Sequence, residues 1–149
     1  MTEGSSTLLK DNPEYIGEVS LFRLYLLRAT YMLLIVGLGL VIWPGIINHS
    51  SSWALKYGDT SALLAAVSVL AVVGIRYPLK MLPLLMFELT WKSIWLIAIA
   101  LPLWQTNQIN AETMESVKAC LMGIIIFPIV IPWKYVIATY VKKPADRWK

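Results

Sequence analysis

Four long apolar segments alternate with short polar ones along the 149-residue chain. The segment 29–48 contains no charged residue, and a helix needs about 20 residues to cross about 30 Å of hydrocarbon. The pattern therefore predicts an all-α integral membrane protein whose four transmembrane helices form a compact bundle with amphipathic terminal segments. The predicted spans cover about 27–47, 60–77, 82–104 and 117–137.

Polar residues set the limits of the predicted transmembrane domain, 20–141. Residues 1–19 are polar and turn-rich, which predicts an N-terminal tail, and 142–149 form a basic C-terminal tail. Ser20 is the expected N-cap of the first helix, because a serine oxygen accepts a hydrogen bond from a first-turn backbone N–H. Pro128 and Pro132 are expected to kink or locally unwind the last span.

Small residues recur at helical spacing along the second span. A small-residue face lets two helices approach closely and gain van der Waals contact. We therefore predict that this face meets a neighbouring helix. Its members are Ser61, Ala65, Ser68 and Ala71.

Basic residues are distributed unevenly between the two ends of the predicted helices. If both termini and the 76–80 turn share one side, that side holds ten basic residues and the opposite side only Lys56 and Lys118. Cytoplasmic loops carry the excess of Lys and Arg, so both termini are predicted to be cytoplasmic. The ten are Lys10, Arg23, Arg28, Arg76, Lys80, Lys134, Lys142, Lys143, Arg147 and Lys149.

Composition agrees with a membrane protein and argues against other classes. The chain is 58% hydrophobic and 15% charged, whereas soluble domains are about 45–50% apolar and about 25% charged. The net charge of +4 does not indicate nucleic-acid binding, because the basic residues flank apolar segments instead of forming one patch. The predicted partner is the lipid bilayer, with no nucleic acid.

Among the four apolar segments, the third contains two charged residues on one helix face, which we call the polar stripe. From Ser93 the apolar run lasts only 12 residues, which covers about 18 Å, so the span must begin near Leu82 and include Glu88 and Lys92. Helical spacing of i, i+3, i+4 and i+7 places four side chains on one face. This candidate intramembrane polar site consists of Glu88, Trp91, Lys92 and Trp95.

Charged residues in a span are costly and mark a functional site by default, yet three interpretations of this stripe remain open. Glu88 and Lys92 form a buried ion pair that fixes helix packing, with the tryptophans as bulk. Alternatively, Glu88 binds a proton or cation, and Trp91 and Trp95 offer aromatic faces to an organic cation. A third interpretation places the stripe at a partner interface.

Other chemistry is sparse in this sequence. A single Cys120 excludes an internal disulfide, and a single His49 excludes bis-histidine haem ligation and histidine-rich metal sites within the chain. We therefore expect no catalytic residues, no metal, no cofactor and no enzymatic activity. An intramembrane enzyme would need groups from another chain.

Two functional hypotheses follow. The first is a non-enzymatic accessory or assembly protein, or a homo-oligomer, that acts through helix–helix contacts with a second copy or a partner membrane subunit. The alternative is a small transporter or channel subunit that uses Glu88 as a proton or cation site. In size and four-span layout the chain is similar to the small multidrug resistance family, whose membrane carboxylate exchanges protons for cations. That family's carboxylate lies in the first span, whereas the first span here has none.

Short outer loops, an uncleaved first span and the lack of a cysteine pair predict a bacterial cytoplasmic (inner) membrane location.

Overall fold

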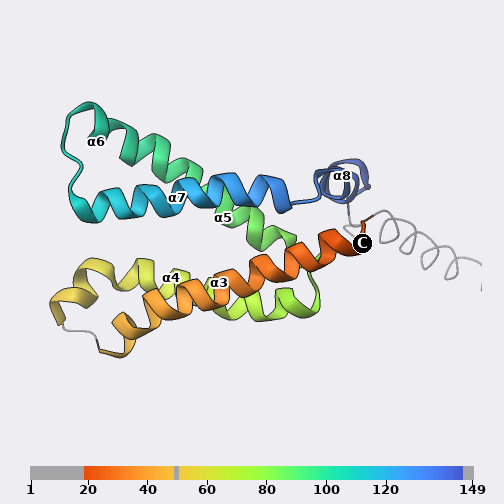
Figure 1. Ribbon diagram of the computed structural model, residues 1–149, viewed down its shortest axis with the longest axis horizontal. Helices are drawn as coiled ribbons and strands as arrows, with labels where there is room; N and C mark the ends of the chain where they lie inside the picture. Colours follow the sequence, from red (N-terminus) through yellow and green to blue (C-terminus); the bar gives the residue numbers. More distant parts are fainter. Residues whose placement is uncertain (1–18, 49–50, 146–149) are drawn as a thin grey trace, which may run out of the picture.

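The computed structural model describes residues 19–48 and 51–145, with the backbone alone at 51–54, and is all-helical over these ranges (Figure 1). Four of the helices are long and apolar enough to cross a membrane, which confirms the predicted all-α class and the number of apolar helices. They are α3 (Leu21–Ile47), α4 (Ser51–Arg76), a continuous third helix built from α5 (Leu82–Trp95), η1 (Leu96–Ala100) and α6 (Leu101–Gln105), and α7 (Ala111–Val130).

The four helices form two antiparallel hairpins. α3 packs along α4, and α5 packs against α7. The hairpins meet through α3 with α7 and α4 with α5, near the turn 77–81, and diverge toward the other end (Figure 1). The packing is therefore less even than in the predicted compact bundle. The α3–α4 contact is the most extensive in the structure, whereas the two hairpins contact each other mainly through the smaller α3–α7 and α4–α5 interfaces.

The small-residue face of α4 is buried, as predicted. It lets Trp43 of α3 reach across, where the indole Nε1 donates a hydrogen bond to Ser68 Oγ at 3.1 Å. Ser68 in turn donates to the carbonyl of Ala65 at 2.7 Å, so its hydroxyl is satisfied in the interface. The four residues predicted for this face, Ser61, Ala65, Ser68 and Ala71, are all buried.

Polar contacts join the start of α3 to the end of α4. Tyr31 is fully buried, and its hydroxyl donates to the carbonyl of Pro78 in the turn at 3.0 Å. Arg28 Nε donates to the carbonyl of Ile75 at 3.1 Å. Carbonyls in the last turn of a helix lack an intrahelical partner, so Arg28 satisfies a group that would otherwise need water.

Ser20 begins α3 as predicted, because its Oγ accepts a hydrogen bond from the Arg23 amide at 3.3 Å. The predicted tail residues 1–18 and 146–149, together with His49, lie outside the described residues.

The segment predicted as the fourth span, about 117–137, is not one continuous helix. α7 ends at Val130, and Ile131 is extended with φ −64° and ψ 124°. Pro132 causes the break, since it has no N–H to donate and disfavours a helical conformation at the preceding residue. The Pro128 carbonyl, which would have accepted that missing hydrogen bond, instead accepts one from Trp133 Nε1 at 2.8 Å.

Pro128 itself lies inside α7 without ending it, so only the second of the two prolines interrupts the helix. The chain then forms α8 (Trp133–Val136) and the π-helical turn η2 (Ile137–Lys142). In Figure 1, α8 is seen nearly end-on, so this segment runs across the direction of α7.

Replacing Gly74 by alanine tests the close approach of α3 and α4. A Cβ at position 74 would lie 2.5–2.7 Å from ring atoms of Tyr31, a side chain held by its hydrogen bond to Pro78. We expect Gly74→Ala to lower the free energy of unfolding by about 1–3 kcal/mol, the usual cost of overpacking. The measurement is equilibrium unfolding in detergent micelles, followed by circular dichroism.

Gly37→Ala is the matched control, because a Cβ at position 37 in α3 meets no atom within 4 Å. We expect this variant to be as stable as the wild type or slightly more stable, since alanine favours helix. Equal effects of the two substitutions would contradict the close approach.

Candidate functional site

Glu88 lies on the buried face of α5. The face begins with Leu82 and Leu85, which are fully buried, and continues one turn later with Glu88, which has no exposed surface, and Lys92, which is 9% exposed. Counted from Leu82, Glu88 lies about 9 Å and Lys92 about 15 Å along the helix axis. Both charged groups are therefore well inside the apolar third helix, as the span-length argument predicts.

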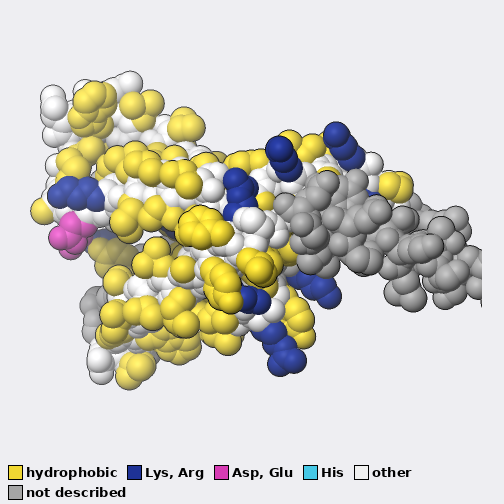
Figure 2. Space-filling model, turned by 45° about the vertical axis from the view of Figure 1, so that its right-hand side comes forward, with side chains coloured by type: hydrophobic (Ala, Val, Ile, Leu, Met, Phe, Trp, Pro, Cys, Tyr) yellow, Lys and Arg dark blue, Asp and Glu magenta, His cyan; other side chains and the backbone are white. Residues whose placement is uncertain are grey.

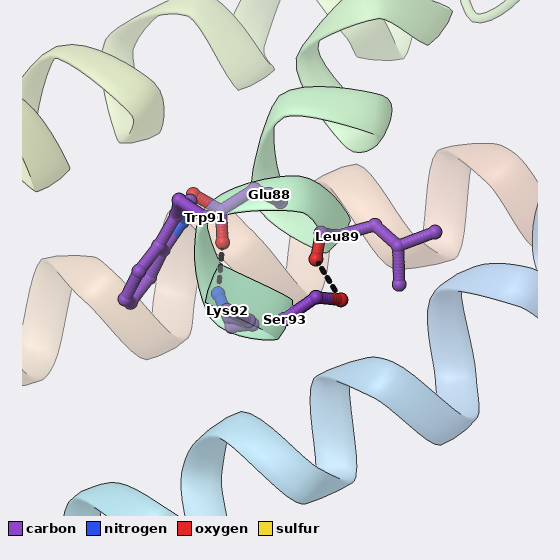
Figure 3. A network of polar contacts seen from close by, with 5 residues as sticks. All are labelled: Glu88, Leu89, Trp91, Lys92 and Ser93. Atoms are coloured by element: carbon purple, nitrogen blue, oxygen red, sulfur yellow. Dashed lines mark hydrogen bonds and ion pairs between the residues drawn. The ribbon is translucent and has the colours of Figure 1, made fainter. Parts of the chain in front are cut away.

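Both oxygens of the Glu88 carboxylate accept hydrogen bonds from its own helix, and Figure 3 shows the one from Lys92. Lys92 Nζ donates to Oε2 and forms an ion pair with it. Trp91 Nε1 donates to Oε1 at 3.0 Å. Hydrogen bonds to an ionised group are about twice as strong as neutral ones, so the buried carboxylate is held from two sides.

The Lys92 ammonium lies between the carboxylate and two aromatic rings. Its Nζ is 4.2 Å from the centroid of the Trp91 ring and 5.5 Å from that of Phe127 on α7. The negative face of an aromatic ring attracts a cation, and the attraction strengthens where water is excluded. Lys92 is therefore stabilised by α5 and α7 together.

Gly123 makes room on α7 for the lysine side chain. A Cβ at position 123 would lie 2.8 Å from Lys92 Cδ and 2.9 Å from its Cε, too close for two carbon atoms. The missing side chain therefore lets the alkyl part of Lys92 lie directly on the backbone of α7. The contact links the ion pair on α5 to the packing of α5 against α7.

Three of the four residues predicted for this site lie together: Glu88, Trp91 and Lys92. Trp95 lies one turn further along, half-buried, and takes no part in the hydrogen bonds that join the other three. Phe127 and Gly123 were missed from the sequence. They belong to a stripe of residues that the structure buries along α7, with members Cys120, Gly123, Phe127 and Val130.

Neighbouring polar groups are also satisfied. The hydroxyls of Thr90 and Ser93 donate to carbonyls of their own helix, those of Met86 and Leu89, at 2.7 and 2.8 Å. Within 19–48 and 55–145, no buried side-chain nitrogen or oxygen lacks a hydrogen-bond partner, and no group of three or more His, Cys, Asp or Glu is placed to hold a metal. The site therefore consists of an ion pair whose hydrogen bonds are satisfied within the chain, with the rings of Trp91 and Phe127 beside the ammonium.

No family model, curated protein or solved structure matches the chain. The comparisons therefore assign neither a family nor an activity to the Glu88–Lys92 pair.

Removing one charge of the pair at a time should destabilise the protein. Glu88→Gln leaves the buried ammonium of Lys92 without its counter-charge, and Lys92→Met leaves the buried carboxylate of Glu88 without its own. We expect each to lower the free energy of unfolding by about 3–5 kcal/mol, while the double variant recovers most of the loss. The measurement is equilibrium unfolding in micelles for all four proteins.

Lys80→Met is the control for loss of a lysine, because Lys80 is exposed in the turn after α4. We expect Lys80→Met to change the free energy of unfolding by less than about 0.5 kcal/mol. Single variants of the pair that unfold like Lys80→Met would show that the ion pair does not hold α5 in place.

Proposed function

We propose that this is a multi-pass protein of a bacterial cytoplasmic membrane, with both termini on the cytoplasmic side. Support comes from the four apolar helices and from the charges at their two ends. Lys56 and Lys118 lie at the end that also holds Asp59, Glu112 and Glu115. The described basic residues of the other end are Arg23, Arg28, Arg76, Lys80, Lys134, Lys142 and Lys143.

Cysteine labelling tests this orientation. With Cys120 replaced by alanine, Thr106→Cys and Lys80→Cys place single thiols at exposed positions on opposite ends. We expect a membrane-impermeant maleimide added to intact spheroplasts to label position 106 at once and position 80 only after permeabilisation. The reverse pattern would contradict the orientation, and labelling of both without permeabilisation would contradict membrane insertion.

We propose further that the protein is not an enzyme and acts through helix–helix contacts, as an accessory or assembly subunit or as a homo-oligomer. The observation that carries this proposal is the state of Glu88. Its carboxylate is fully buried and is already bound by Lys92 and Trp91 of the same helix. A substrate cation would have to displace a tethered ammonium, which is present at high effective concentration.

The outward faces of the second hairpin support an interaction role. The third helix exposes Ile94 and Ile97, and α7 exposes Ile125 and Ile129, each with 60–69% of its surface accessible. In a membrane these faces meet either lipid chains or the helices of another subunit. The two hairpins contact each other near the 77–81 turn and diverge toward the other end (Figure 1), so each hairpin packs mainly on itself there.

Extraction from native membranes in a mild detergent, followed by cross-linking and mass spectrometry, tests the assembly proposal. We expect a defined complex, containing either further copies of the chain or a second membrane protein. The Glu88→Gln/Lys92→Met double variant should still form it, because the proposal assigns the pair to packing and not to exchange. A monomer without any partner would contradict the proposal.

One observation favours a transporter as the second candidate. The Lys92 ammonium is surrounded by a carboxylate and two aromatic rings, which is the environment that an organic cation site requires. The π-helical turn η1 follows four residues after Lys92, and such turns are frequent at functional sites. A pH-dependent cation flux into vesicles that is lost in Glu88→Gln would establish this function in place of the first.

A further inference from the structure

A cavity of about 330 Å³ lies where the start of α3 meets the break after α7. It is lined by Ser20 and Arg23 on one side and by Trp133, Lys134 and Tyr135 on the other. The volume is at the lower end of the range of about 300–1,000 Å³ that ligand sites usually occupy. A headgroup of a few heavy atoms fits such a cavity, whereas a whole lipid does not.

The cavity is basic, and its cations have no acidic partner in the part of the chain that the structure describes. Arg23 and Lys134 are exposed, and neither forms an ion pair among the described residues. The described carboxylates all lie elsewhere: Glu88 is buried in the third helix, and the others are at the opposite end of the helices. On the face that Figure 2 shows, Lys and Arg side chains lie around this end, and no acidic side chain of the described residues is visible among them. The chain supplies no described counter-charge here, so an external anion is favoured.

Donors suited to phosphate are present on both sides of the cavity. A guanidinium binds phosphate through a rigid set of N–H groups, and an ammonium adds a compact charge. The Ser20 hydroxyl accepts the amide of Arg23, which leaves its own proton to donate. The indole of Trp133 forms part of the wall and is held in place by its hydrogen bond to Pro128.

Exposed apolar side chains lie close in sequence to the residues that line the cavity. Leu21 and Phe22, next to Arg23 in sequence, are 74% and 75% exposed, and Ile137 after α8 is 45% exposed. A soluble anion would gain nothing from these side chains. A phospholipid would place its acyl chains against them while its phosphate enters the cavity, since basic pockets on the cytoplasmic side of membrane helices bind anionic headgroups.

We propose that this cavity is a binding site for the phosphate headgroup of an anionic phospholipid of the cytoplasmic leaflet. Arg23 and Lys134 bind the phosphate, Ser20 donates a hydrogen bond to it, and Trp133 and Tyr135 cover the glycerol side. The choice of leaflet rests on the orientation proposed above. The affinity in micelles does not depend on that orientation, so the lipid proposal and the cysteine-labelling result fail independently.

Native mass spectrometry of the full-length protein in a neutral detergent tests the site. Dioleoylphosphatidylglycerol and dioleoylphosphatidylcholine are offered at equal concentration. We expect one anionic lipid to be retained preferentially, and Arg23→Gln/Lys134→Gln to reduce that preference about tenfold. Arg23→Lys/Lys134→Arg, which keeps both charges, should retain most of it.

Lys142→Gln/Lys143→Gln is the matched control, because it removes the same charge from the same end without touching the cavity lining. A loss of preference as large as in Arg23→Gln/Lys134→Gln would overturn the proposal in favour of a diffuse surface charge. Equal retention of the neutral lipid by the wild type would also overturn it. Displacement of the lipid by millimolar sn-glycerol 3-phosphate would assign the site to a soluble phosphate.

Circular dichroism of each variant shows whether it has folded. If the double variant does not fold, Arg23→Gln and Lys134→Gln are measured singly, and the preference of the wild type is followed against salt. Binding through these cations predicts a preference that falls as salt rises, because exposed charges are screened. A preference independent of salt would contradict the site.

Discussion

Glu88 is fully buried in the third apolar helix, where an ionised carboxylate needs a counter-charge and hydrogen-bond donors from the protein itself. Lys92 and Trp91 supply them from the same helix, one on each oxygen. Because all three groups belong to α5, the pair does not depend on a distant element to form. The rest of the second hairpin is arranged around it.

Lys92 also links the ion pair on α5 to α7. Its alkyl part lies against the backbone at Gly123, and its charge faces the ring of Phe127. The first hairpin is held differently, through the small-residue face of α4 and the hydrogen bonds of Tyr31 and Arg28. The two hairpins are thus stabilised by different contacts, and they meet near the 77–81 turn. Their remaining apolar faces are open to lipid or to other helices.

The number of apolar helices and the position of Glu88 inside the third of them followed from segment length alone, because the bilayer thickness fixes how long an apolar helix must be. The burial of its carboxylate was only one of three interpretations that the sequence left open. The small-residue face was predictable for the same kind of reason, since helical spacing determines which residues share a face. The contact with Gly123 and Phe127 was not, because nothing in one sequence says which face of α7 meets α5. The interruption at Pro132 was expected, but the predicted span extended past it to about 137, because hydropathy stays high where the helix ends.

Labelling of Glu88 by a hydrophobic carbodiimide in native membranes tests the central claim most directly, because the reagent reacts with protonated carboxyl groups. Mass spectrometry of the peptide that contains Glu88 gives the extent of reaction. We expect Glu88 to be unreactive at neutral pH in the wild type. In Lys92→Met it should become reactive, because the carboxylate has lost the ammonium that forms its ion pair. Equal labelling of wild type and variant would contradict a carboxylate held closed by Lys92.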